Sequence, residues 1–315
     1  MRAFVLPDFD QAPEVQELPV PEPGECEVRV KVHAASVNGF DLAVAGGYLK
    51  GGMEHRFPVV LGKDFAGVVD AVGPGVDGYA VGDRVFGVVT KPYLGDGSFA
   101  ERVTVPVAVG LAPIPEGVSF PEAAALGLAG TAAFDSVAAA GITPGGVVLV
   151  AGATGGVGNQ AVQLAAAAGA QVIATAHTDA EREHVTGLGA AGIVDFTADI
   201  PAQIHATHPE GVDVVLHFAG DPVSLATVLK PGGRLVSTIA QSAEQAGVPQ
   251  ESFTGVYAVP TPQTLGRLAE NQATGLTRVR VEESYDLAGV AVAFGHFGRG
   301  TLGKLVVVIA EEETA

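Results

Sequence analysis

The sequence predicts an α/β protein of two domains, one of them built on a doubly wound parallel sheet. In the second half, apolar β-branched segments of strand length alternate with helix-length segments rich in Ala and Leu. These strand segments are continuously apolar, which is typical of strands covered by helices on both faces. The front half instead shows period-two patterns divided by turn signals, which predict antiparallel β structure.

The predicted parallel strands follow one another with a helix between each pair. The five apolar segments occupy residues 147–150, 171–176, 192–196, 212–218 and 233–239. A sixth strand near residues 253–259 would complete the sheet. Strands that alternate with helices in this way predict parallel pairing through helical crossovers.

The front half and the tail are expected to form the other domain. Alternating stretches at 26–37, 65–73 and 98–105 are separated by turn sequences such as GPGVDG and LGDGS. After the sheet domain, the sequence predicts a helix at 261–275, a strand at 277–285, a helix at 287–300 and a strand at 303–310. The last strand is expected to return to the first domain. The expected domains are therefore 1–118 with 260–315, and 119–259.

Composition and charge exclude several classes of function. A chain of 315 residues favours two domains with a large core. No apolar stretch approaches the roughly 20 residues of a membrane span, and the start MRAFVLPDFD lacks a secretory signal. We therefore expect a soluble, cytoplasmic protein without a membrane partner. The net charge of −18, from 35 acidic and 17 basic residues, opposes nucleic-acid binding.

The most informative segment is VVLVAGATGGVGNQAVQLAAAAGA, which predicts a strand, a Gly-rich turn and an Ala-rich helix. Gly155 is expected to allow a tight turn, Gly156 a close approach to a pyrophosphate, and Gly158 close packing of helix on strand. The first glycine of the G-x-G-x-x-G pattern is replaced by Ala153, but the strand-turn-helix context still predicts dinucleotide binding. The expected pyrophosphate-binding residues are Ala153, Thr154, Gly155, Gly156, Val157 and Gly158.

The end of the second strand indicates which dinucleotide is bound. NAD is usually held there by an Asp or Glu, where this chain has Ala176. The next residues offer His177, Thr178 and Arg182 as donors to a 2′-phosphate, so NADPH is the expected cofactor. Arg182→Ala is then expected to weaken NADPH binding and leave NADH binding nearly unchanged. The alternative is that Arg182 and His184 belong to a solvated helix face.

The motifs AASVNGFDLAVAGG, FPVVLGKDFAGVVDAVGPGV, VGDRVFG and AGATGGVG, in this order, resemble the medium-chain dehydrogenase/reductase superfamily over nearly the whole chain. The branch that looks closest is that of the zinc-free quinone oxidoreductases. The resemblance implies a GroES (chaperonin-10)-like catalytic domain beside a Rossmann domain. It also implies a homodimer, with edge-strand pairing near residues 253–259 as its expected interface.

The same comparison implies that no metal is bound. Where zinc alcohol dehydrogenases carry Cys-x-x-Asp, this chain has Asn38 before Asp41, and where they carry Gly-His-Glu, it has Lys63 and Asp64 after glycine. Two zinc ligands of that branch are therefore missing.

Cysteine and histidine usage points the same way. Cys26 is the only cysteine, so neither an internal disulfide nor a four-cysteine zinc lobe is possible within the chain. His205, His208 and Glu210 have a metal-like spacing, but their polar segment is more typical of a surface loop.

The resemblance also implies positions for the remaining site residues. Asn38 should lie by the nicotinamide, Tyr48 near the mouth of the substrate cleft, and Thr131 near the nicotinamide ribose or phosphate. The loops after two later strands should pass beneath the nicotinamide, as expected for ligands at strand carboxyl ends. The loop residues are Phe218, Ala219, Gly220, Ile239 and Ala240.

These residues together predict a zinc-free NADPH-dependent oxidoreductase that reduces a quinone or an α,β-unsaturated carbonyl compound. Such acceptors take a hydride without help from a Lewis acid, so the protein mainly supplies positioning. Tyr48, Lys63 and Asp64 are candidates to donate to, or orient, the reduced acceptor. Alternatively, Asp64 holds Asn38 in place and water supplies the proton.

Two other functions remain open at this stage. The first is an enoyl thioester reductase of a biosynthetic pathway, which uses the same hydride geometry. The second is a non-catalytic NADPH-binding sensor or structural protein.

Overall fold

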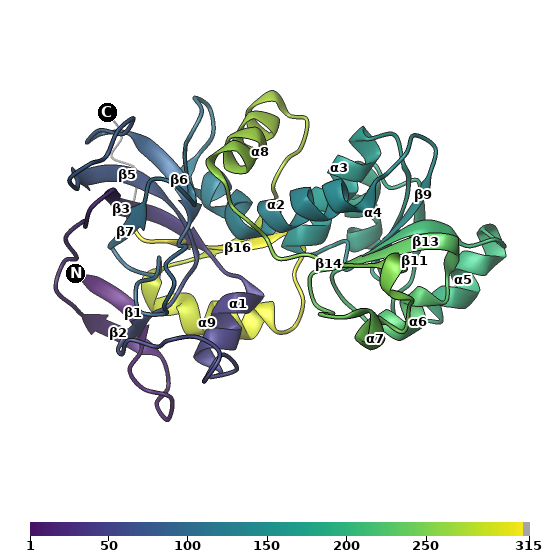
Figure 1. The fold of residues 1–315 in the computed structure, drawn as a ribbon, viewed down its shortest axis with the longest axis horizontal. Helices are drawn as coiled ribbons and strands as arrows, with labels where there is room; N and C mark the ends of the chain where they lie inside the picture. Colours follow the sequence, from purple (N-terminus) through teal and green to yellow (C-terminus); the bar gives the residue numbers. More distant parts are fainter. Residues whose placement is uncertain (311–315) are drawn as a thin grey trace. The chain divides into compact units, whose positions relative to one another are not determined.

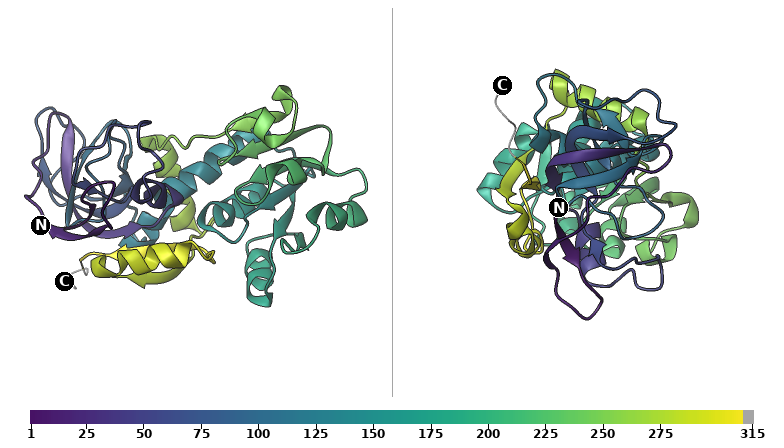
Figure 2. Two further views of the ribbon diagram at one scale, coloured as in Figure 1. Left: turned by 90° about the horizontal axis from the view of Figure 1, so that it is seen from below. Right: turned by 90° about the vertical axis from the view of Figure 1, so that its left-hand side faces the viewer.

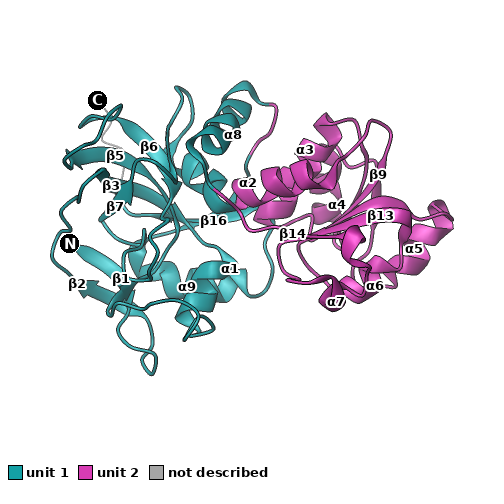
Figure 3. Cartoon of the chain, in the orientation of Figure 1, with its two compact units in different colours: residues 1–128, 260–275, 279–315 teal, residues 129–259, 276–278 magenta. Residues whose placement is uncertain are grey.

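The computed structural model describes residues 1–310. The chain forms two compact units, coloured separately in Figure 3. Unit 1 contains residues 1–128, 260–275 and 279 onward, and unit 2 contains residues 129–259 and 276–278. The sequence placed the first boundary at residue 119, whereas the units divide inside helix α2 (Phe120–Ala140). The reason is that the start of α2 packs in a core of unit 1 and its end packs in a core of unit 2.

Unit 2 is built on a six-stranded sheet, in which each strand pairs in parallel with its neighbours. The strands are β9 (Val147–Ala151), β10 (Gln171–Thr175), β11 (Gly192–Val194), β12 (Val212–His217), β13 (Leu229–Ser237) and β14 (Phe253–Gly255). Their order is β11-β10-β9-β12-β13-β14, with β14 at one edge. The predicted doubly wound sheet is confirmed. The strand order reverses beside β9, where such sheets bind ligands.

Helices cover both faces of this sheet (Figure 1). They are α3 (Gly156–Ala167), α4 (Asp179–Gly187), α5 (Ile200–Thr207), α6 (Pro222–Ala226), α7 (Ala243–Ala246) and the short 3₁₀ helix η1 (Gln250–Ser252). Successive residues of β9 alternate between two cores: Val148 packs with α3 and α4, and Leu149 packs with α5, α6 and α7. This explains why the strand is apolar at every position.

Unit 1 is rich in β-strands, most of which pair in antiparallel fashion; only the strand at 281–285 pairs in parallel among the described residues. They are β1 (Arg2–Leu6), β2 (Glu14–Glu17), β3 (Glu27–Ser36), β4 (Val59–Val60), β5 (Asp64–Val72), β6 (Arg84–Val88), β7 (Arg102–Pro106), β8 (Leu111–Pro113), β15 (Val281–Tyr285) and β16 (Lys304–Val308). One sheet has the order β2-β1-β4, and the other has the order β15-β16-β3-β5-β6-β8 with β7 paired to β3. Because β16 pairs antiparallel with β3, the tail returns to this unit as expected.

Besides the first part of α2, unit 1 has few helices. They are α1 (Gly39–Ala45), α8 (Pro262–Thr274), α9 (Val290–Phe297) and the 3₁₀ helix η2 (Leu287–Gly289). The predicted helix at 287–300 is therefore shorter and begins as a 3₁₀ turn. Helix α9 packs against β1 from the other end of the chain, and Figure 2 shows the yellow helix beside the purple strands.

The expectation that no apolar segment reaches membrane-spanning length is wrong for α2. Within the described residues it is the one helix long and apolar enough for a span, with 21 residues and a mean hydropathy of 1.4 in its most apolar part. That part is 67% buried inside the protein. The sequence of α2 is apolar because it contributes to the cores of both units, and core helices meet the same length criterion.

Candidate functional site

The turn between β9 and α3 reverses at Gly152. Its φ of +85° lies in the left-handed region, and a Cβ there would lie 3.0 Å from the Cβ of Ala219. The sequence assigned the tight turn to Gly155, which is wrong, because Gly155 has a φ of −73° and ordinary space around it. Tertiary packing against Ala219 therefore decides which glycine makes the turn.

Gly158 has the packing role that the sequence predicts. A Cβ at this position would lie 2.1 Å from the carbonyl oxygen of Gly152 and 2.6 Å from Cα of Ala153. Helix α3 therefore approaches the end of β9 more closely than any side chain would allow. Gly155, the residue before the helix, has no side chain to cap the first amides of α3. Uncapped helix amides are a ready site for a phosphate.

A pocket of about 350 Å³ opens beside this turn within unit 2. Thr154, Ala219 and Gly220, three of the predicted cofactor residues, contribute to its lining. Its size and mixed apolar and polar lining suit a nucleoside. The sequence missed the other lining residues, which are Ala151, Gly152, Thr175, Phe196, Ala198, Ile200, Asp221, Ser224 and Leu225. The segment after β11 was the available signal, because ligand-binding residues gather at strand carboxyl ends.

Thr178 serves mainly to start helix α4. Its hydroxyl accepts from the amide of Glu181 at 3.2 Å, and the Glu181 carboxylate accepts from the Thr178 amide at 3.0 Å. The same carboxylate accepts from the amide of His177 at 2.7 Å. This reciprocal capping fixes the loop after β10.

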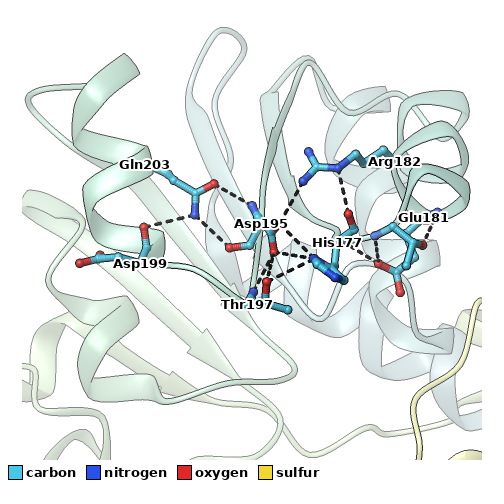
Figure 4. A network of polar contacts seen from close by, with 8 residues as sticks. His177, Glu181, Arg182, Asp195, Thr197, Asp199 and Gln203 are labelled. Carbon is cyan, nitrogen blue, oxygen red and sulfur yellow. Dashed lines mark hydrogen bonds and ion pairs between the residues drawn. The ribbon is translucent and has the colours of Figure 1, made fainter.

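His177 and Arg182 both contact Asp195, which follows β11 (Figure 4). His177 Nδ1 lies 3.0 Å from Asp195 Oδ2, and Arg182 Nη2 lies 3.3 Å from the same oxygen. Hydrogen bonds from Thr197, and then from His177, lower the pKa of Asp195 below its usual range. Neither side chain is merely solvated, because Arg182 has this partner and His184 contacts Asn159 at 2.7 Å. A role of Arg182 in nucleotide binding stays a prediction.

The loops after β12 and β13 are tied together by His217, a buried residue that the sequence missed. Its Nε2 lies 3.1 Å from the carbonyl oxygen of Gly220, and its Nδ1 lies 2.8 Å from Oγ of Ser237. Ser237 Oγ in turn accepts from the amides of Ile239 and Ala240. The carbonyl can only accept, so Nε2 carries the proton and Nδ1 accepts from Ser237.

Burial lowers the pKa of His217, which favours this neutral form. The His217 imidazole thus links the two loops that contain the predicted residues Phe218, Ala219, Gly220, Ile239 and Ala240. A polar residue ending the apolar strand VDVVLH was the signal in the sequence.

In unit 1, Asn38 is held by a buried carboxylate and a buried ammonium. Its Nδ2 donates to Asp64 Oδ2 at 2.8 Å, and Lys304 Nζ donates to its Oδ1 at 2.7 Å. The alternative that Asp64 holds Asn38 in place is therefore correct. The sequence missed Lys304, a lysine inside the apolar strand GKLVVVIA.

Asp64 and Lys304 are both almost inaccessible to solvent. Asp64 accepts from Ser36 Oγ at 2.6 Å and from the amide of Leu128 at 2.7 Å, and it lies 3.6 Å from Lys304 Nζ. Lys304 is 4% exposed and also donates to the carbonyl of Val37. Burial lowers the pKa of Lys304, and the charge of Asp64 opposes that effect.

Asp41 adds a second buried carboxyl group to this cluster. Its Oδ2 accepts from the amide of Asn38 at 2.8 Å, whereas its Oδ1 has no hydrogen-bond partner among the described residues. Burial, and then the charge of Asp64, raise the pKa of Asp41 to about 7. The sequence used Asp41 only as part of a family motif and gave no sign of this shift.

The predicted residues Lys63, Tyr48 and Thr131 lie in different surroundings. Lys63 Nζ donates to the carbonyl of Val89 and lies 5.0 Å from the centre of the Phe40 ring, and burial lowers its pKa. Tyr48 is 84% exposed, and Thr131 is fully buried in α2. The structure therefore joins Asn38 and Asp64, whereas neither Tyr48 nor Lys63 has a hydrogen bond to either of them among the described residues.

Zinc does not fit the residues at the positions of the missing ligands. The Asn38 oxygen already accepts from an ammonium group, and Lys63 is itself a cation bound to a carbonyl. Protein zinc sites use thiolate, imidazole or carboxylate donors. Within residues 1–310, no group of three or more His, Cys, Asp or Glu side chains is placed to hold a metal ion. In particular, His205, His208 and Glu210 do not form such a group.

Comparison with known families gives two matches. Residues 24–116 match the alcohol dehydrogenase GroES-like domain, and residues 156–255 match the zinc-binding dehydrogenase domain. The first match lies in unit 1 and the second in unit 2.

Curated relatives are much longer than this chain. A mycocerosic acid synthase-like polyketide synthase of Mycolicibacterium smegmatis is 40% identical over 69% of the chain, which spans 10% of that protein. A phenolphthiocerol/phthiocerol polyketide synthase component of Mycobacterium tuberculosis is 32% identical over 98% of the chain, which spans 15% of that protein.

Solved structures match over nearly their whole length. An NAD-dependent alcohol dehydrogenase is 32% identical with a TM-score of 0.86, covering 98% of this chain and 100% of that one. The quinone oxidoreductase of Coxiella burnetii is 27% identical with a TM-score of 0.89, covering 98% and 99%. CurK enoyl reductase is 28% identical with a TM-score of 0.83, covering 98% and 99%. This chain therefore belongs to the medium-chain dehydrogenase/reductase superfamily, whose members are oxidoreductases that use a nicotinamide nucleotide.

Proposed function

We propose that this protein is a zinc-independent, NADPH-dependent reductase of quinones or α,β-unsaturated carbonyl compounds. The observation that carries the proposal is the buried contact of Lys304 with Asn38. Asn38 stands where the zinc-dependent branch has a zinc ligand, and its amide oxygen already accepts from the Lys304 ammonium group. Without a Lewis acid, the acceptor has to be one whose reduced form needs little charge stabilisation. Conjugated carbonyl compounds meet this condition, since the enolate formed by hydride addition has its negative charge delocalised onto oxygen.

Unit 2 has the features needed to hold the nucleotide. The amides at the start of α3 suit the pyrophosphate, and the pocket lined by Thr154, Phe196 and Gly220 suits the adenosine. The loops tied by His217 supply backbone groups at the strand carboxyl ends. The bound nicotinamide supplies the hydride, and the protein's part is to orient it and keep water away.

Unit 1 supplies the groups that serve the acceptor in this proposal. The amide of Asn38 has a single orientation, because Asp64 and Lys304 occupy its two ends. Reduction adds one hydride and one proton to the acceptor, and the proton comes from Lys63 or from water. Lys63 suits this role because its lowered pKa makes it a better acid than an exposed lysine.

A second candidate is reduction of an enoyl thioester. It is supported by the similarity to CurK enoyl reductase and to segments of polyketide synthases. The chemistry is the same hydride addition to a conjugated carbonyl, so the unit 1 cluster does not separate the two. The strongly acidic chain argues against tight binding of a phosphorylated thiol carrier.

The deciding experiment is a cofactor-saturated acceptor screen with metal analysis of the same sample. Quinones, simple enones and a crotonyl thioester are each offered with NADPH, and NADPH consumption is measured. We expect turnover with a quinone or an enone and zinc far below one equivalent. Faster turnover of the thioester than of every other acceptor would favour the second candidate.

Two outcomes would contradict the proposal. Stoichiometric zinc whose removal abolishes turnover would show that a metal takes part. Tight NADPH binding without turnover of any acceptor would instead support a non-catalytic nucleotide-binding protein.

A further inference from the structure

The carboxylate of Asp195 contacts both side chains, His177 and Arg182, that are predicted to bind a 2′-phosphate. Asp195 Oδ2 lies within 3.3 Å of both His177 Nδ1 and Arg182 Nη2. Thr197 donates to Asp195 Oδ1 from its hydroxyl at 2.7 Å and from its amide at 2.9 Å. One carboxylate therefore engages the imidazole, the guanidinium and the Thr197 donors together (Figure 4).

The backbone of Asp195 is also held in place. Gln203, on α5, accepts from the Asp195 amide at 2.8 Å and donates to the Asp195 carbonyl at 2.9 Å. The Asp195 side chain is only 24% exposed. Asp195 is thus a positioned group and not a mobile surface acid.

This group lies beside the nucleoside pocket. The next residue, Phe196, and Ala198 line that pocket, and His177 follows β10, at the end of which the adenosine ribose is held in sheets of this type. Position 176, which carries the acid in NAD-specific members of this fold, is a buried alanine. Asp195 is therefore the carboxylate bonded to the two side chains, His177 and Arg182, that are predicted to bind a 2′-phosphate.

We propose that Asp195 sets the nucleotide specificity by acting as an internal counter-ion. It competes with the 2′-phosphate of NADPH for Arg182 and His177, and so reduces the preference for NADPH over NADH. The inference rests on the proposed function, because it assumes that a nicotinamide nucleotide occupies this pocket.

The physical basis is charge competition at short range. A 2′-phosphate adds one to two negative charges next to a carboxylate that already pairs with the Arg182 guanidinium. The phosphate gains the contacts with Arg182 and His177 only by sharing them with Asp195, and repulsion between the two anions offsets part of the gain. A neutral group of the same shape at position 195 removes the repulsion and frees Arg182 and His177 to donate to the phosphate.

The test compares wild type with Asp195→Asn, which keeps the shape and removes the charge. The probes are 2′,5′-ADP, which carries the 2′-phosphate, and 5′-ADP, which lacks it, each titrated by calorimetry. We expect 2′,5′-ADP to bind about fivefold or more tightly in the variant, with 5′-ADP unchanged within about twofold, as for loss of one partly exposed charge. The same ratio is expected for NADPH against NADH.

Two controls separate the local contact from general charge. Asp179→Asn removes an equal charge at the first residue of α4, which has no described contact to Arg182 or His177, and should shift 2′,5′-ADP binding by less than about twofold. Arg182→Ala should weaken 2′,5′-ADP and abolish the effect of Asp195→Asn in the double variant.

The outcomes distinguish this inference from the proposed function. Equal or weaker 2′,5′-ADP binding in Asp195→Asn, with wild type binding both probes, overturns the role of Asp195 alone. If wild type binds neither the probes nor NADPH, the proposed function fails as well. If Asp195→Asn markedly lowers the melting temperature, Asp195→Ser, which can still accept from Thr197, replaces it. The affinities for 2′,5′-ADP and 5′-ADP are then compared with wild type in the same way, and equal or weaker 2′,5′-ADP binding again overturns the role of Asp195.

Discussion

Asp41 is a buried carboxyl group that lowers the stability of the folded protein when it is ionised, and nothing in the local sequence indicates this effect. It lies within the buried cluster around Asn38, and one of its carboxyl oxygens has no partner among the described residues. Burial and the charge of Asp64 raise its pKa from 3.8 to about 7. The folded protein therefore binds this proton more tightly than the unfolded chain does.

The sign of the pH dependence follows from linkage. Between about pH 4 and about pH 7 the unfolded chain releases the Asp41 proton while the folded protein keeps it, so this residue lowers stability as the pH rises. Above about pH 7 both states have lost the proton and the cost is constant.

We therefore predict that Asp41→Asn stabilises the protein increasingly from pH 4 to pH 7. Asparagine can still accept from the Asn38 amide and has no charge to bury. Melting curves of both proteins at matched pH should show a gain that grows by about 2 °C or more over this range and then levels off. A gain independent of pH would show that Asp41 keeps an ordinary pKa when folded.

The contact between Asn38 and Lys304 is another residue-level feature that the sequence could not predict. The resemblance identified Asn38 as a site residue, because its motif occupies a recognisable place in the chain. Lys304 lies 266 residues away and reaches Asn38 only because β16 pairs with β3. No local pattern connects the two.

At the scale of elements, the turn from β9 to α3 is predictable as a unit but not in its details. The glycine pattern and its strand-turn-helix context predict a phosphate-binding loop. The neighbouring loop at Ala219 leaves little room for a Cβ at Gly152, whose φ is +85°, whereas Gly155 has an ordinary conformation.

We predict that Gly158→Ala destabilises the protein and that Gly155→Ala does not. The new methyl group at 158 would collide with the backbone of Gly152 and Ala153, whereas at 155 its nearest neighbour would lie 3.8 Å away. Overpacking of this kind typically costs about 1–3 kcal/mol. Chemical denaturation of both variants checks the difference, and equal stabilities would mean that the turn shifts without cost.

At the scale of the whole molecule, the edge of the six-stranded sheet is the basis for a proposed homodimer. Among the described residues, strand β14 pairs with β13 alone, which leaves its other edge open to a further strand. Beyond it in the chain lie two exposed apolar side chains, Tyr257 at 74% and Val259 at 56% exposed. Such a surface suits symmetric pairing with a second copy of the chain.

Light scattering at micromolar concentration should therefore give twice the chain mass of 31.7 kDa. We expect Tyr257→Asp to shift the protein to the monomer, because a charge is costly to bury in an apolar interface. Val292→Asp, an equivalent change at a 64% exposed residue of α9, is the matched control and should remain dimeric. A monomeric wild type would refute the proposed dimer.

The sequence by itself determined the parallel sheet, the returning tail, the glycine-rich turn between strand and helix, and the superfamily. These follow from local periodicity and from glycines whose role depends on neighbours in the chain. Only the tertiary structure decided the partners of the charged residues: Lys304 with Asn38, and Asp195 with Arg182 and His177. The physical reason is that a charge is stabilised by whatever group lies within a few ångströms, and folding brings such groups together from distant parts of the chain.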